Sequence, residues 1–252
     1  MSGEYNFDFG MACEGDTDFP VIERIIEGVF CNFELEDEIT ELQPLNLQGD
    51  DETRGGDSRL LHYLTLKRFR DDVFACRYIV IQVDTDVPNS GRWANLNLRD
   101  ANGKELPVED IVKKVRDYLI EKIESGQPGF YESNAGKIIF AISVHSIECW
   151  LFSLKSTNAK NVGKIKNCES LLADVLRKDK NLVDLTEQVK GQKGQYKMKK
   201  EQNVGGKSNY ALLANGFVLK NGKNIQVVRK QDSSFDIFVT SLEGLNYEPE
   251  ED

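Results

Sequence analysis

Apolar and polar residues follow two different periods in the first part of the chain. Residues 5 to 13 alternate bulky apolar residues with polar or small ones, which predicts a strand. Residues 19 to 30 repeat apolar residues at spacings of three and four, which predicts a helix that begins after a polar turn at residues 14 to 18. Together these segments predict a strand, a turn and a helix in succession.

This alternation of strands and helices continues to residue 154. Residues 74 to 83 are rich in β-branched side chains and almost continuously apolar, so we expect a central strand that helices cover on both faces. Further strands are predicted at residues 39–45 and 137–144, and further helices at residues 57–69, at 108–124 and from 146 onward. Such alternation is typical of an α/β fold with a largely parallel sheet flanked by helices.

The pattern changes beyond residue 154, where short amphipathic segments replace the long strands. Helices are predicted at residues 168–177, 181–190, 208–219 and 233–242, with a loop rich in lysine, glutamine and glycine at 191–206. We therefore expect an α/β domain over residues 1–154, a basic and mainly helical C-terminal subdomain over 155–247, and an acidic tail at 248–252.

Composition places the chain among globular proteins. Of its 252 residues, 40% are apolar and 29% charged, which excludes a fibrous or wholly disordered protein. The longest apolar stretches fall far short of the roughly 20 residues that cross a bilayer, so no membrane association is expected. The first residues carry Glu4 and Asp8 and no basic cluster before an apolar run, which predicts a cytoplasmic protein.

The five cysteines are odd in number and widely spaced, with no pair separated by two residues. Only two histidines accompany them, which argues against a zinc site. We expect all five to be reduced thiols that behave as small buried apolar residues.

Charge is divided unevenly along the chain. Residues 1 to 58 hold sixteen acidic residues against two arginines, whereas residues 155 to 207 hold thirteen basic residues against six acidic ones. Both blocks are compatible with ordinary solvated surfaces. The alternative is that the acidic part collects metal cations and the basic part collects phosphates.

Carboxylates follow three of the predicted strands. Glu14 follows the first strand, Asp84 and Asp86 follow the central one, and Glu148 lies shortly after the strand that ends at residue 144. Because the carboxyl ends of parallel strands meet at one edge of a sheet, these side chains are expected to converge. Asp84 and Asp86, two residues apart, are expected to point the same way. Turn-capping acids without a metal are the alternative.

Carboxylate oxygens are the ligands that Mg²⁺ prefers, and such a site can activate a water molecule for phosphoryl displacement. The predicted ligands of one or two metal ions are Glu14, Asp84, Asp86 and Glu148. Two other acids in the first turn, Asp16 and Asp18, are expected instead to cap the following helix through their side chains.

A lysine-rich tract around Tyr196 is the candidate nucleic-acid contact. Its lysines lie among glycines, a composition that can follow a phosphate backbone without reading sequence. Enhanced solubility is the alternative explanation. The lysines assigned to nucleic-acid binding are Lys193, Lys197, Lys199, Lys200 and Lys207.

Two motifs together carry a family resemblance. Residues 13–22 (CEGDTDFPVI) and 78–86 (YIVIQVDTD) resemble the TOPRIM domain of topoisomerases, bacterial primases and the nucleases of the overcoming-lysogenization-defect type. Residues 141–151 (AISVHSIECWL) are similar to a third segment of small stand-alone TOPRIM-like proteins of bacteria and phages, several of which act in antiviral defence. The resemblance covers roughly residues 5 to 154.

This resemblance implies acid/base chemistry or metal binding for Glu14, and Mg²⁺ or Mn²⁺ binding for Asp84 and Asp86. The chain lacks an ATPase phosphate-binding motif, and it is too small for a topoisomerase or a primase. The resulting hypothesis is a metal-dependent nuclease of DNA or RNA, in antiviral defence or as a toxin-like effector. The alternative is an inactive sensor or regulatory subunit. An ATPase or other defence partner and a homo-oligomer both remain open.

Overall fold

The structure has a four-stranded parallel sheet at its centre. It is a computed structural model that describes residues 5–33, 35, 38–43, 56–86, 96–156, 167–199, 208–245 and 247. The strands are β1 (Phe7–Ala12), β2 (Ile39–Gln43), β3 (Cys76–Asp84) and β4 (Ile138–Ser143), in the order β2-β1-β3-β4. All three strand pairs are parallel, which confirms the predicted parallel sheet.

The order of the strands reverses at β1. After β1 the chain continues to β2 on one side, then crosses back to β3 on the other side and on to β4. Phe9 lies beside Tyr78 of β3, and Asp84 at the end of β3 lies beside Ser143 of β4. The carboxyl ends of β1 and β3 therefore flank a topological switch point, the place where open parallel sheets bind ligands.

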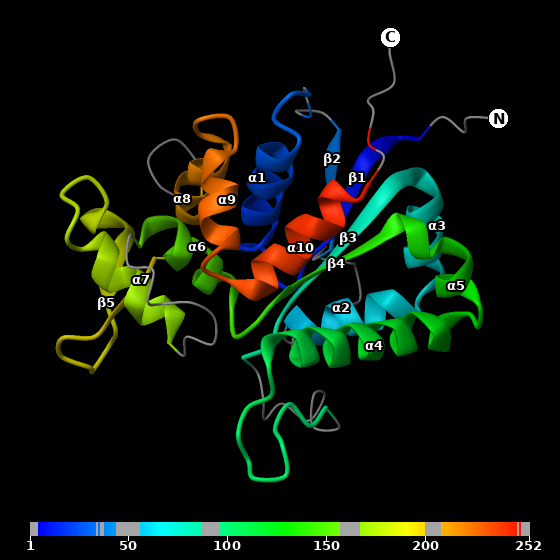
Figure 1. The fold of residues 1–252 in the computed structure, drawn as a ribbon, viewed down its shortest axis with the longest axis horizontal. Coiled ribbons are helices and arrows are strands. Elements are labelled where there is room, and N and C mark those ends of the chain that lie inside the picture. Colours follow the sequence, from blue (N-terminus) through cyan, green and yellow to red (C-terminus); the bar gives the residue numbers. More distant parts are fainter. Residues whose placement is uncertain are drawn as a thin grey trace.

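Helices cover both faces of the sheet (Figure 1). One face carries α1 (Phe19–Val29), α6 (Ile147–Lys155), α8 (Asn209–Val218), α9 (Lys223–Arg229) and α10 (Ser233–Glu243). The other face carries α2 (Gly56–Thr65), α3 (Lys67–Ala75), α4 (Val108–Gly126) and the short α5 (Phe130–Asn134), which a 3-10 turn, η1 (Ala135–Lys137), connects to β4. The fold is thus a three-layer α/β/α arrangement. None of the helices in the described ranges is both long and apolar enough to cross a membrane.

The predicted helix at 57–69 is two helices, α2 and α3. Leu66 between them adopts an extended conformation, with φ −81° and ψ 154°, so the helix cannot continue through it. The break lets α3 turn and lead directly into β3, because α3 ends at the residue before that strand begins.

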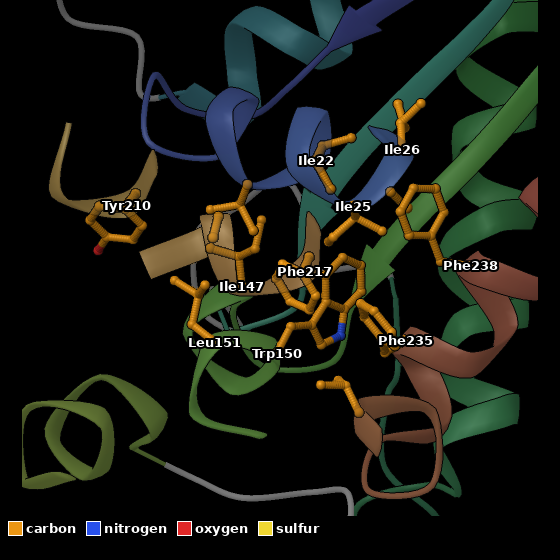
Figure 2. Packing of buried hydrophobic residues seen from close by; sticks show 14 of the residues in the cluster. Ile22, Ile25, Ile26, Ile147, Trp150, Leu151, Tyr210, Phe217, Phe235 and Phe238 are labelled. Carbon is orange, nitrogen blue, oxygen red and sulfur yellow. The ribbon is translucent and has the colours of Figure 1, made fainter. Parts of the chain in front are cut away.

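Trp150 lies at the centre of the first hydrophobic layer (Figure 2). Its ring stacks on Phe238 of α10 with a centroid separation of 5.7 Å, and its indole N–H donates to Ser234 Oγ at 2.9 Å. The same cluster includes Phe9 of β1 and Ile22 of α1. Residues on both sides of the predicted boundary at 154 therefore share one core, in which α10 packs on β4 and α8 packs on α1.

The helix predicted at residues 181–190 is wrong. A short 3-10 turn, η2 (Val183–Leu185), leads there into β5 (Thr186–Gln188), which pairs antiparallel with β6 (Tyr196–Met198). Two glycines with positive φ, Gly191 and Gly194, lie in the connection, where their freedom from a Cβ permits the hairpin turn. The first half of the predicted basic loop is therefore part of a β-hairpin, next to α7 (Cys168–Leu176).

The expectation that all five cysteines are reduced is also wrong. Cys149 of α6 and Cys168 at the start of α7 form a disulfide, with their Cα atoms 5.0 Å apart. The pairing is set by the packing of α6 against α7, which a separation of 19 residues does not reveal. Cys13 and Cys76 are buried free thiols, as expected, whereas Cys31 is free and exposed.

Gly28 controls how closely α1 and α8 approach. A Cβ at this position would lie 2.7 Å from the carbonyl oxygen of Phe217, a backbone atom that cannot easily move. We expect Gly28→Ala to lower the free energy of unfolding by about 1 to 2 kcal/mol, because overpacking outweighs the gain in helix propensity. Urea denaturation of this variant tests the expectation. Gly136→Ala, where a Cβ meets nothing within 4 Å, is the control and should unfold like the natural protein.

Candidate functional site

Glu14 and Asp84 meet at the switch point of the sheet, although 70 positions separate them in sequence. The backbone N–H of Asp84 donates to Glu14 Oε2 at 3.1 Å. The backbone N–H of Glu14 in turn donates to the side-chain oxygen of Gln82 at 3.1 Å. The contact arises because β1 and β3 run parallel as neighbours, so their carboxyl ends lie together. The predicted convergence of these two acids is confirmed.

Two polar side chains orient the carboxylate of Asp84. Gln82 is fully buried, and its Nε2 donates to Asp84 Oδ1 at 2.9 Å. The hydroxyl of Ser143, also fully buried, donates to the same oxygen from β4. Asp84 Oδ2 accepts no hydrogen bond from a residue that the structure describes, so this oxygen is available as a ligand atom.

The sequence analysis missed Gln82 and Ser143, although each leaves a signal. Gln82 interrupts the apolar run of β3, and Ser143 ends the apolar run of β4. A polar side chain inside a strand that is buried on both faces needs a hydrogen-bond partner. Both residues find that partner in the same aspartate.

Asp18 also belongs to this group of acids. It occupies the N-cap position of α1, as predicted, but its side chain makes no capping hydrogen bond to the helix. Its Oδ2 instead accepts the backbone N–H of Gly15 at 2.8 Å, and Asp18 is only 6% exposed. The expectation of a side-chain cap is therefore wrong, because the carboxylate turns back toward the loop that carries Glu14.

Negative charge accumulates around Asp84. Burial raises the pKa of Asp84 well above its ordinary value, and the nearby carboxylates of Asp18, Glu148 and Glu14 raise it further. The hydrogen bond from Ser143 acts in the opposite direction. The pKa of the buried Cys13 thiol is raised by burial first and then by Asp18, Glu41 and Asp84. Such a group of carboxylates favours the uptake of a proton or a cation.

Glu148 follows β4, and its charge acts on the carboxylate of Asp84. It lies in the first turn of α6, and its Oε1 accepts the hydroxyl proton of Tyr210 at 2.6 Å. Its charge contributes to the raised pKa of Asp84, so it lies within electrostatic reach of that carboxylate. The predicted convergence of Glu148 with the other acids stays a prediction, and Tyr210 is a neighbour of Glu148 that no pattern in the sequence indicated.

Asp86 is placed differently from Asp84. Because β3 ends at Asp84, the alternation of a strand no longer sets the direction of Asp86, which is exposed whereas Asp84 is partly buried. Thr85 between them is held by backbone hydrogen bonds to the carbonyl oxygens of Ser143 and His145. The two aspartates thus differ in exposure, and the expectation that their side chains point the same way stays a prediction.

The predicted nucleic-acid lysines are only partly within the described ranges. Lys193 is exposed in the hairpin connection, and Lys197 forms an ion pair with Glu187 at 3.1 Å. Lys199 is partly buried, and its backbone N–H donates to Leu185. Lys200 and Lys207 lie outside the described residues.

The arrangement fits a divalent cation held by two protein carboxylates. No three histidine, cysteine, aspartate or glutamate side chains in the described ranges are grouped closely enough to hold a metal ion by themselves. Mg²⁺ is usually bound by one or two carboxylates together with waters and substrate phosphates. Glu14 and Asp84, joined by the hydrogen bond from the backbone N–H of Asp84 to Glu14 Oε2, supply two such carboxylates.

Comparison with known proteins finds no matching family model, no similar curated protein and no similar solved structure. The resemblance to the TOPRIM domain therefore rests on the sequence motifs at residues 13–22 and 78–86 and stays a prediction.

Proposed function

We propose that the protein is a TOPRIM-type nuclease that hydrolyses phosphodiester bonds with a bound Mg²⁺ or Mn²⁺ ion. The observation that carries this proposal is the contact between Glu14 and Asp84 at the switch point of a parallel sheet. Their oxygens are the donor type that these cations prefer. The accumulated negative charge around Asp84 provides the electrostatic attraction for a cation.

In this proposal each side chain has a distinct task. Glu14 and Asp84 hold the cation, and Gln82 and Ser143 keep the carboxylate of Asp84 in one orientation. Asp86 joins them as the second aspartate of the motif, on the strength of the family resemblance. When bound, the cation supplies a more acidic water and a positive charge at the phosphate.

The basic region beyond residue 155 is proposed to guide the nucleic acid. Of the predicted contact lysines that the structure describes, Lys193 is exposed, at a hairpin connection, whereas Lys197 and Lys199 are partly buried. Contacts of this kind are electrostatic, so binding should weaken steeply as salt is added. A role in antiviral defence, or as a toxin-like effector, is the setting that the resemblance suggests.

Cleavage assays with the purified protein test this proposal. We expect plasmid DNA, single-stranded DNA, total RNA or transfer RNA to be cleaved with Mg²⁺ or Mn²⁺ and to stay intact with EDTA. Glu14→Gln keeps an acceptor for the N–H of Asp84 but removes the charge, and should slow cleavage at least about 100-fold. Asp117→Asn removes an exposed acid of α4 paired with Lys113 and should cleave at the natural rate.

A catalytically inactive sensor or regulatory subunit is the second candidate. It is favoured by the two hydrogen bonds that already occupy Asp84 Oδ1 and by the lack of a three-ligand group in the described ranges. Calorimetric titration with Mn²⁺ separates the two. Binding that Glu14→Gln weakens supports the nuclease, whereas neither binding nor cleavage supports the regulatory subunit.

A further inference from the structure

Tyr210 connects the C-terminal helices to the group of acids. It lies in the first turn of α8 and is completely buried, in the cluster that also contains Ile147 and Leu151 of α6 (Figure 2). Its hydroxyl donates to Glu148 Oε1 at 2.6 Å across 62 positions in sequence. A side chain from beyond residue 155 therefore reaches an acid of the site.

Hydrogen bonds at the start of α8 fix the position of Tyr210. Ser208 caps α8 by accepting the N–H of Ala211 at 3.0 Å, and the side chain of Asn209 donates to the carbonyl of Lys199 at 2.9 Å. Farther along, α8 packs closely on α1 at Gly28. The start of α8 is thus held at both the cap and the helix interface, which restricts movement of Tyr210.

The tyrosine is suited to act as a hydrogen-bond donor. Burial raises the pKa of Tyr210, and the charge of Glu148 together with the hydrogen bond to it raises the pKa further. The Tyr210 hydroxyl is therefore protonated at neutral pH. A hydroxyl that donates to one oxygen of Glu148 limits the rotation of that carboxylate.

We propose that Tyr210 is a positioning residue that holds the Glu148 carboxylate within electrostatic reach of Asp84, where its negative charge increases the affinity of the site for a divalent cation. This inference rests on the proposed function. In this proposal the site includes residues of both the α/β part and the C-terminal helices, because Tyr210 of α8 orients Glu148 of α6. Partners of this kind around metal ligands typically change metal affinity by 10- to 100-fold when they are removed.

Mn²⁺ binding by the full-length protein tests the inference, with free Mn²⁺ measured by electron paramagnetic resonance. Tyr210→Phe should raise the dissociation constant for Mn²⁺ about tenfold. The matched control is Tyr63→Phe, because Tyr63 is equally buried and donates to Asp72 Oδ2 at 2.6 Å in the layer on the opposite face. Both variants lose one buried hydrogen bond, so their melting temperatures should fall similarly, while Tyr63→Phe should keep the natural affinity.

A second variant shows whether Tyr210 acts through Glu148. Glu148→Gln keeps an acceptor for Tyr210 but lacks the charge, so it should also bind Mn²⁺ about tenfold more weakly. In that background, adding Tyr210→Phe should change the affinity no further. Natural affinity in Tyr210→Phe, an equal loss in Tyr63→Phe, or additive losses in the double variant would overturn the inference.

The same experiment distinguishes failure of the inference from failure of the proposed function. If the natural protein binds no Mn²⁺, the nuclease proposal and the inference both fail. If the natural protein binds and Tyr210→Phe binds equally well, only the inference fails. Should Tyr210→Phe not fold, natural affinity in Glu148→Gln overturns the inference by itself.

Discussion

Asp84→Asn is expected to abolish metal-dependent cleavage and, at the same time, to stabilise the metal-free protein. Asparagine keeps an oxygen that can accept from Gln82 and Ser143, so the local hydrogen bonds survive. It removes a charge that is buried among the carboxylates of Asp18, Glu148 and Glu14. We expect the free energy of unfolding to rise by about 1 to 2 kcal/mol, as is common where function requires an unfavourable charge.

This stabilisation should depend on pH. Because the folded protein raises the pKa of Asp84, the protonated form is favoured by folding, and the natural protein loses stability as pH rises from the unfolded value, about 3.9, through the raised folded value. The variant lacks this titration. The stability difference should therefore be small near pH 4, increase as pH rises, and level off above the folded pKa.

Urea denaturation in EDTA at several pH values, with cleavage assays alongside, measures both effects. Asp71→Asn is a suitable control, because Asp71 is an exposed acid of α3 paired with Lys67. An Asp84→Asn protein that is less stable than the natural one at neutral pH would contradict the assigned charge repulsion. Retained cleavage would contradict the role of Asp84 in the nuclease.

Trp150→Ala is expected to cause the largest loss of stability among the changes considered. Trp150 is completely buried, stacks on Phe238 and contacts Phe235 edge-on at a centroid distance of 5.4 Å. Truncation creates a cavity and leaves Ser234 without the indole N–H, so we expect a cost of about 3 to 5 kcal/mol. At this chain length that cost corresponds to roughly 6 to 20 °C in melting temperature.

Circular dichroism during heating measures this loss. Phe74→Ala is the control, because Phe74 is 63% exposed and its truncation should cost less than about 1 kcal/mol. The comparison also tests whether the C-terminal helices stabilise the α/β part, since Trp150 is covered by α10. A loss at Trp150 no larger than that at Phe74 would indicate that α10 is not packed on the sheet in solution.

Several parts of the molecule were predictable from local pattern. The four parallel strands and the helices between them follow from apolar spacing, which reports directly how each element is buried. Glu14 and Asp84 were predictable as neighbours because both follow strands, and parallel strands end at one edge. This reasoning does not apply to Asp86, because β3 ends at Asp84 and strand geometry sets no side-chain direction beyond it.

Other features are decided by contacts between distant elements. The break at Leu66 divides one predicted helix into α2 and α3, and a 3-10 turn and strand β5 replace the helix predicted at residues 181–190. The disulfide between Cys149 and Cys168 depends on how α6 packs against α7.

The candidate site shows the same division. The sequence by itself determined which acids follow the strands, because the direction and period of a strand are local properties. The tertiary structure decided that Gln82 and Ser143 orient Asp84, that Asp18 turns toward the loop of Glu14, and that Tyr210 holds Glu148. Those contacts depend on which elements pack together. Burying a polar group is unfavourable unless a partner forms a hydrogen bond with it, and Ser143 and Tyr210 each find that partner on another element.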